Sequence, residues 1–299
     1  MSATRLTAFV SGVGIVIAAT MVLAGCSPAA PQAGSAAVAE APAFEHIHEL
    51  VPDPGNGSLL VATHAGIYRL ILDEDGTAEA VGPLGGFDFD VMGFALAGGI
   101  AYASGHPGPT TSTTFGSPNL GLIRSSDVGE SWTSVSLTGL TDFHSLTVIT
   151  YDDRSPRVFG YDASAGRLER SIDGGTSWSA RAVLDARDIV AVGDQLYATT
   201  PDGLALSNDG GATFAVDPDA PGLYVIASDD TGTLAGVDTT GTLWTRSPGQ
   251  NWVHGHTIEG TARAIAVDGA RVYVADDRRI AHTDDAGGTW TTLKLTGSP

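Results

Sequence analysis

The chain has 299 residues, a single cysteine and a net charge of −19, from 34 Asp and Glu against 15 Lys and Arg. One cysteine excludes an intrachain disulfide, and an acidic chain without a basic patch excludes nucleic acid as a partner. The length is enough for one large domain with a sizeable core.

Residues 1–25 have the pattern of an export signal. Arg5 precedes a mostly apolar run from Leu6 to Leu23, and the run ends in Leu-Ala-Gly-Cys at Cys26. Such a signal is removed from the mature protein. The competing interpretation is a transmembrane helix, but the run is barely long enough for one and no stop-transfer charges follow it.

The tetrapeptide before and including Cys26 resembles the lipobox of bacterial lipoproteins. This resemblance implies that Cys26 carries lipid and holds the protein on the outer side of a cell membrane, at the cell surface or in the periplasm. The residues up to 43 are small, contain proline and are uncharged except for Glu40. We therefore predict a signal over 1–25, a lipidated cysteine and flexible linker over 26–43, and a folded domain over 44–299.

Six units of four β-like runs follow residue 44, which predicts an all-β, six-bladed β-propeller. The first and last units each contain four runs of their own. We therefore expect the ring to close by packing of complete blades and not by strand sharing. The first runs of the six units are expected over 47–51, 91–96, 144–149, 188–192, 224–227 and 264–267.

A turn motif returns roughly every 40 residues, as in repeat architectures. Its first copy has Ser125, Asp127, Gly129 and Trp132. Because Ser and Asp accept bonds from nearby backbone N–H groups and Gly permits positive φ, the motif is predicted to be a structural hairpin turn between the third and fourth strands. Further copies contain Asp173 and Trp178, Asp209 and Phe214, and Asp285 and Trp290, and a degenerate copy has Ser247 and Trp252.

The motif resembles the Asp-box, or BNR repeat, of sialidases, sortilin-type receptors and photosystem-assembly propellers. In these families the motif is a structural brace remote from the ligand face. That implies a binding face on the opposite side, where the loops before each first strand and after each second strand emerge.

Five histidines and a methionine fall on that predicted binding face in the first three units. His48, Met92 and His144 hold equivalent positions at the start of the innermost strand. Imidazole suits Cu, Zn, Fe and Ni, and a thioether favours Cu(I), so copper or another transition metal is the predicted ion for these three. Isolated loop histidines and a core methionine remain the alternative. The full set of predicted ligand-binding residues is His46, His48, His64, Met92, His106 and His144.

Several segments, among them His46-Ile-His and Asp142-Phe-His, resemble bacterial lipoproteins of a glycosyl hydrolase or exo-sialidase-like group. The resemblance implies a glycan substrate as one alternative. The Arg-Ile-Pro signature of sialidases is absent, and Glu259 is the best predicted partner for Tyr224. The candidate catalytic residues are Asp90, Asp142, Asp188, Arg187, Tyr224 and Arg263.

A third alternative is an assembly or interaction scaffold with a protein partner, as in the sortilin and photosystem propellers. The long loop 105–119 of the second unit rises beside the predicted histidines. Loops of this length in compact domains are frequently functional.

Overall fold

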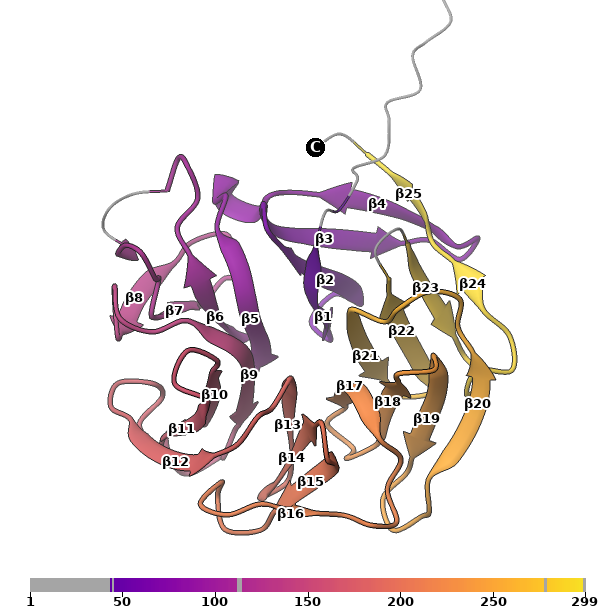
Figure 1. Cartoon of the computed structure of the whole chain (residues 1–299). Helices are drawn as coiled ribbons and strands as arrows, with labels where there is room; N and C mark the ends of the chain where they lie inside the picture. The colour runs from indigo at the N-terminus through magenta and orange to yellow at the C-terminus, as the bar shows by residue number, and fades with distance from the viewer. Residues whose placement is uncertain (1–43, 45, 112–114, 277–278, 298–299) are drawn as a thin grey trace, which may run out of the picture. The chain divides into compact units, whose positions relative to one another are not determined.

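The computed structural model describes residue 44 and residues 46–111, 115–276 and 279–297. The predicted signal and linker lie outside these described residues. Within them the chain forms six sheets arranged as blades around a centre, which confirms the predicted six-bladed β-propeller (Figure 1). No helix in the described part has the length and apolar character needed to cross a membrane.

Each blade consists of four consecutive strands, and the first strand of each lies innermost. Blade one contains β1 (Ile47–Asp53), β2 (Ser58–Thr63), β3 (Gly66–Leu72) and β4 (Thr77–Val81), and the short 3-10 turn η1 (Leu84–Gly86) follows it. Blade two contains β5 (Asp90–Ala97), β6 (Ile100–His106), β7 (Leu122–Ser125) and β8 (Thr133–Ser136), and blade three β9 (Phe143–Ile149), β10 (Arg157–Asp162), β11 (Arg167–Ser171) and β12 (Ser179–Val183). Blade four contains β13 (Asp188–Val192), β14 (Gln195–Thr200), β15 (Gly203–Ser207) and β16 (Ala215–Val216), and blade five β17 (Leu223–Ser228), β18 (Leu234–Asp238), β19 (Thr242–Arg246) and β20 (Val253–Thr257). Blade six contains β21 (Ala264–Asp268), β22 (Arg271–Ala275), β23 (Ile280–Thr283) and β24 (Thr291–Thr292), and β25 (Lys294–Thr296) ends the described chain.

The core lies between the blades. Six buried clusters occur, one at each junction of neighbouring blades, including the junction of blade six with blade one. Strand β2 is buried along its whole length, whereas the outer strand β12 is mostly exposed. Because a central strand is covered on both faces by adjacent blades, its sequence is a nearly continuous apolar run and does not alternate.

The closure of the ring corrects the expectation from sequence. After β24 the chain leaves blade six, and β25 pairs in parallel with β4 of blade one, with Lys294 opposite Thr77 and Thr296 opposite Glu79. Blade one is therefore a five-stranded sheet (Figure 1). From the sequence, residues 294–296 are expected to end blade six. In the structure they pair with the exposed edge strand of blade one.

A one-residue register shift recurs at the start of the innermost strand in four blades. The strand pairs β1–β2, β5–β6, β9–β10 and β17–β18 all carry it, and a bulge of this kind re-aims the side chain of the extra residue. The residues passed over by the pairing are His48, Met92, His144 and Tyr224.

The predicted structural role of the turn motif is confirmed by its hydrogen bonds. In the first copy Ser125 Oγ donates to Asp127 Oδ1 at 2.6 Å and accepts from the N–H of Gly129 at 2.8 Å. The same carboxylate accepts from the backbone N–H and the hydroxyl of Ser131. Equivalent bonds recur around Asp173, Asp209 and Asp285. The degenerate copy keeps only the turn itself, which is closed by the backbone bond from Gln250 N–H to Ser247 O at 3.0 Å.

These bonds predict a loss of stability in acid. Hydrogen bonds from Ser125 and Ser131 lower the pKa of Asp127 to about 2, and equivalent donors lower the pKa of Asp173 and of Asp209 to about 2. An unfolded aspartate titrates near pH 3.9. The folded pKa is the lower one, so the stabilisation is fully present above about pH 4 and is lost as the pH falls towards 2.

We therefore expect the melting temperature to fall between pH 4 and pH 2, and to fall less steeply in an Asp173→Asn variant. Thermal melts followed by circular dichroism from pH 7 to pH 2 measure this. Parallel curves for the variant and the parent protein over that window would contradict the assignment.

Candidate ligand site at the channel mouth

A cavity of about 360 Å³ lies at the mouth of the central channel, where all six blades contribute lining residues. The bulge at the start of four of the six first strands explains part of this convergence, because the extra side chains of His48, Met92 and His144 line the cavity. The lining residues are His46, Ile47, His48 and Glu49 from blade one, Met92 from blade two, His144 from blade three, Arg187 and Asp188 from blade four, Val225 from blade five, and Arg263 and Ala264 from blade six.

Two imidazoles and a carboxylate meet beside this cavity. One ligand atom each of His48, His64 and Asp90 lies within 4.8 Å of the others. His64 Nδ1 is 2.6 Å from Asp90 Oδ1, and His48 Nε2 is 3.6 Å from the same oxygen. The three residues come from β1, from the turn after β2 and from the first position of β5, so the packing of blade two on blade one assembles the group.

Two polar atoms of this group lack hydrogen-bond partners of good geometry. His48 Nε2 and Asp90 Oδ1 are buried, and neither makes a hydrogen bond of ordinary geometry to any described group. Buried polar atoms are normally paired, because leaving one unpaired costs about 1–3 kcal/mol. A cation bound among the three ligands removes this cost.

The electrostatics favour a cation at the same place. Burial alone raises the pKa of Asp90, but the contacts with His48 and His64 outweigh burial and hold the pKa below its usual range. The carboxylate is therefore ionised at neutral pH.

His46 and His64 complete the surroundings of the group. The ring of His64 lies edge-on to the rings of His46 and His48, with centroid separations of 4.7 and 4.8 Å. His46 has a φ of 55°, in the left-handed region that few residues other than glycine adopt. Backbone strain of this kind clusters at functional sites.

A second group lies one blade further on. His144 Nε2 is 2.8 Å from Asp142 Oδ2, and His106 Nε2 is 3.2 Å from the same oxygen. The hydrogen bond with Asp142 raises the pKa of His144, although burial opposes the shift. His144 also lines the cavity, so both groups reach the channel mouth through one imidazole.

The candidate catalytic residues from blades four and five have a different environment. Both oxygens of Asp188 are bonded, Oδ1 by the hydroxyl of Ser145 at 2.9 Å and Oδ2 by the N–H of Ile226 at 3.0 Å. Asp188 thereby joins blades three, four and five. The guanidinium of Arg187 lies 4.0 Å from the ring centroid of Tyr224, within cation–π range.

Glu49 is a cavity residue that the sequence reasoning missed. Burial raises the pKa of Glu49 well above its usual range, the nearby Asp188 raises it further, and Arg187 lowers it. Burial likewise raises the pKa of Asp188. Glu49 directly follows the bulged His48 on the innermost strand, and both side chains line the cavity.

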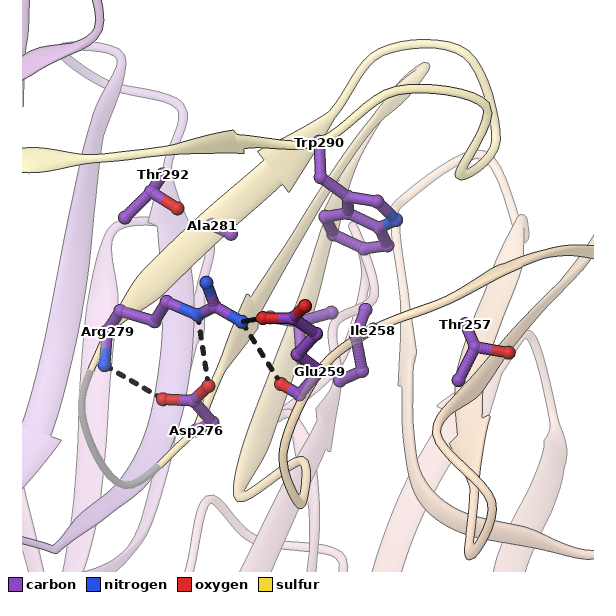
Figure 2. Close-up of a pocket in the computed structure, with 9 residues that line it drawn as sticks. Thr257, Ile258, Glu259, Asp276, Arg279, Ala281, Trp290 and Thr292 are labelled. Atoms are coloured by element: carbon purple, nitrogen blue, oxygen red, sulfur yellow. Dashed lines mark hydrogen bonds and ion pairs between the residues drawn. The ribbon is translucent and has the colours of Figure 1, made fainter.

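The prediction that Glu259 partners Tyr224 is wrong. Glu259 lines a separate cavity of about 190 Å³ formed by blades five and six (Figure 2). There its carboxylate and its backbone oxygen each accept from Arg279 Nη2 at 3.3 Å, and Arg279 Nε also donates to Asp276 at 3.2 Å. The charged groups of this outer cavity therefore satisfy one another.

The described parts of loop 105–119 are anchored next to the second group. The ring of Phe115 is buried against Phe87 and Phe89. Asp88 accepts from the N–H of Thr110 at 2.9 Å and from the hydroxyl of Thr111 at 2.7 Å. These contacts fix the described parts of the loop against the segment that precedes β5.

Comparison with protein-family models and with curated proteins gives no match. Among solved structures, the chain is similar to one in the crystal structure of a nidogen/laminin complex, with a TM-score of 0.60 and 19% identity over 80% of this chain and 96% of that one. It is also similar to a GH74 enzyme from Niastella koreensis, with a TM-score of 0.56 and 16% identity over 85% of this chain and 46% of the enzyme. A GH74 xyloglucanase from Xanthomonas campestris gives a TM-score of 0.52 and 17% identity, again over 85% and 46%.

These similarities show the β-propeller fold. At identities of 16–19% they extend to the fold alone. This chain spans less than half the length of either GH74 enzyme. The chemistry at the channel mouth is therefore set by this chain's own residues.

Proposed function

We propose that this chain is a lipid-anchored, extracytoplasmic β-propeller that binds a divalent transition-metal ion at the channel mouth through His48, His64 and Asp90. The lipid anchor rests on the sequence around Cys26. The metal site rests on one structural observation, namely that one ligand atom each of His48, His64 and Asp90 lies within 4.8 Å of the others at the edge of the cavity.

The donor set decides which ions fit. Two imidazole nitrogens and one carboxylate oxygen suit Zn(II), Fe(II), Ni(II) and Cu(II). Met92 lines the same cavity, and its thioether is a ligand that Cu(I) prefers, so copper belongs among the ions to test. Three protein ligands leave a coordination position for water or a small ligand entering from the cavity.

The test is a calorimetric titration of the full-length chain, stripped of metal and held in detergent, with Zn(II), Cu(II) and Ni(II). We expect stoichiometric binding that weakens at least 10–100-fold in an Asp90→Asn variant, because the charged ligand is lost while the size is kept. His256 on β20 is exposed and distant in sequence from both groups, so His256→Gln is the matched histidine control. Unchanged affinity in Asp90→Asn would exclude this site.

The other two functions inferred from sequence have less support. Glycoside hydrolysis needs two available carboxyl groups about 5–10 Å apart, and both oxygens of Asp188 are already bonded. Of the three arginines that a sialidase requires, the cavity contains Arg187 and Arg263. For the scaffold alternative, no surface of the described residues points to a particular protein partner.

A further inference from the structure

We propose that the outer cavity between blades five and six is a further binding site, which takes a neutral sugar ring against the indole of Trp290. This cavity of about 190 Å³ shares no described lining residue with the cavity at the channel mouth. It also uses none of the three proposed metal ligands. The inference therefore goes beyond the proposed function and does not depend on it.

The walls of the outer cavity are apolar. Val274 of β22 is buried, whereas Ile258, Ala281 and Trp290 are partly exposed and also line the cavity. Figure 2 shows the indole of Trp290 directed toward Ile258. Small-molecule sites are typically apolar in this way, with a few polar groups that fix the orientation of the ligand. Because the volume is below the range of about 300–1,000 Å³ that suits drug-sized ligands, the occupant is limited to one small ring.

The charged groups of the cavity are held in a fixed arrangement. The backbone N–H of Arg279 donates to Asp276 Oδ1 at 2.9 Å, and Arg279 Nε donates to Oδ2 of the same carboxylate at 3.2 Å. Arg279 Nη2 donates to Glu259. Among the described residues no bond reaches the other terminal nitrogen, Nη1, which points toward Ala281 (Figure 2). Two N–H donors of Arg279 are therefore available to a ligand.

The pairing of these charges favours a neutral ligand. A cation would meet the guanidinium of Arg279, and an anion would meet the carboxylates of Glu259 and Asp276. Hydroxyl groups avoid both conflicts, because a hydroxyl accepts from a guanidinium N–H and donates to a carboxylate oxygen. Hydrogen bonds to ionised groups are also the stronger kind. A neutral ring that carries several hydroxyls fits this set of donors and acceptors.

The indole of Trp290 supplies the apolar surface that such a ring needs. The C–H groups of a sugar carry a small positive charge because of the neighbouring oxygens, and the face of an aromatic ring is its negative side. Thr257 and Thr292 add two hydroxyl groups to the lining. A purely apolar ring would leave the N–H groups of Arg279 Nη1 without an acceptor, so a sugar is the better match.

Trp290 also differs from the equivalent tryptophans of the turn motif. Trp132 and Trp178 each donate Nε1 to the carbonyl of the motif glycine, at 3.1 and 3.0 Å. In the copy that contains Trp290 the corresponding carbonyl, that of Gly287, accepts from the N–H of His256 at 3.3 Å. Trp290 Nε1 has no partner among the described residues. The motif therefore does not fix this indole, which is held by packing at the junction of blades five and six.

The test is ligand-detected NMR on the full-length chain, stripped of metal and held in a detergent without a sugar headgroup. The probes are the methyl glycosides of glucose, galactose, mannose and N-acetylglucosamine, each beside the corresponding trisaccharide. Sialic acid and choline are the charged comparison ligands. We expect saturation transfer to at least one neutral sugar, with the millimolar affinity usual for one small ring, and none to the charged ligands.

Arg279→Met is the first variant, because it removes the hydrogen-bond donors and keeps an apolar stem. We expect the affinity for the sugar to fall at least about tenfold. Arg157→Met is the matched control, since Arg157 is also a partly exposed arginine in an ion pair, with Asp194, and it does not line this cavity. The control is expected to bind like the parent protein.

Trp290→Phe is the second variant and decides the question if Arg279→Met does not fold. The motif accepts phenylalanine at this place, as Phe214 shows in the third copy. We expect a smaller loss of affinity than in Arg279→Met, because part of the aromatic face remains. Trp178→Phe makes the same change outside the cavity and is expected to leave binding unchanged.

Equal affinity in Arg279→Met and the parent protein would overturn the site. So would the absence of binding by every neutral sugar at about 10 mM, or binding of sialic acid or choline alone. Sugar binding is expected to persist in Asp90→Asn, and its loss there would place the sugar at the channel mouth instead. Tighter binding of a trisaccharide than of its monosaccharide would identify the end of a glycan as the occupant, whereas equal affinities would identify a free sugar.

Discussion

Deletion of residues 294–299 is expected to lower the stability of the propeller by about 3–5 kcal/mol. The deletion removes β25, whose three residues pair with Thr77, Ala78 and Glu79 of β4. Each backbone hydrogen bond contributes about 1 kcal/mol, and the partly buried side chain of Leu295 adds about 1 kcal/mol, less than a fully buried leucine. Leu295 packs against the cluster that joins blade six to blade one, so the loss falls on the closing junction of the ring.

Urea unfolding followed by tryptophan fluorescence measures this change. Deletion of residues 297–299 is the matched control, because it shortens the chain and leaves β25 intact. We expect a lower midpoint for the larger deletion alone. Equal midpoints for the two deletions would mean that blade packing closes the ring without β25.

Phe143→Ala is expected to cost about 3–5 kcal/mol, the usual range for removing a buried phenylalanine. The ring of Phe143 is fully buried and packs 4.8 Å from the ring of Trp178. It also fills the space above Gly160, where any side chain would overlap the ring. The alanine variant therefore leaves a cavity that its neighbours cannot easily fill.

The same residue supports the second histidine group. The N–H of Phe143 donates to Ser104 Oγ at 2.9 Å, which ties β9 to blade two between Asp142 and His144. Urea unfolding of Phe143→Ala beside Phe143→Leu measures the effect, with the leucine variant expected to lose less than half as much. A loss below about 1 kcal/mol in the alanine variant would contradict the packing described here.

The sequence predicted the blades because their signals are local. Each inner strand is an apolar run bounded by turn residues, and the turn motif repeats with its own hydrogen-bond partners inside it. Ser125, Asp127 and Gly129 bond to one another and to Ser131, so nothing distant is needed to recognise them. The first strand of every blade was predicted to within a few residues.

The closing strand was not predictable in this way. Residues 294–296 are too short to be read as a strand, and their partner Thr77 lies at the other end of the domain. Strand addition to an exposed edge depends on the geometry of the closed ring, which no local pattern records.

The candidate site was predicted in part. The equivalent positions of His48, Met92 and His144 follow from the repeat, but the grouping of His48 with His64 and Asp90 depends on how blade two packs on blade one. Asp188 was named from sequence as a candidate catalytic residue, but its bonds to Ser145 and Ile226 depend on how blade four packs between its neighbours. The sequence was therefore enough to predict that these residues lie on one face of the propeller, whereas the contacts between their side chains required the structure.

Four blades carry a bulge residue at the start of the innermost strand, namely His48, Met92, His144 and Tyr224. The extra residue in each of these four strands takes no part in the pairing ladder, so its replacement leaves the backbone pairing in place, and of the four Tyr224 also packs against the core cluster between blades five and six. These four residues carry an imidazole, a thioether, an imidazole and a phenol, in that order. Substitutions at these positions, for instance Tyr224→His or Met92→His, would change the number and position of metal-ligating side chains at the start of the innermost strands while the six blades keep their arrangement.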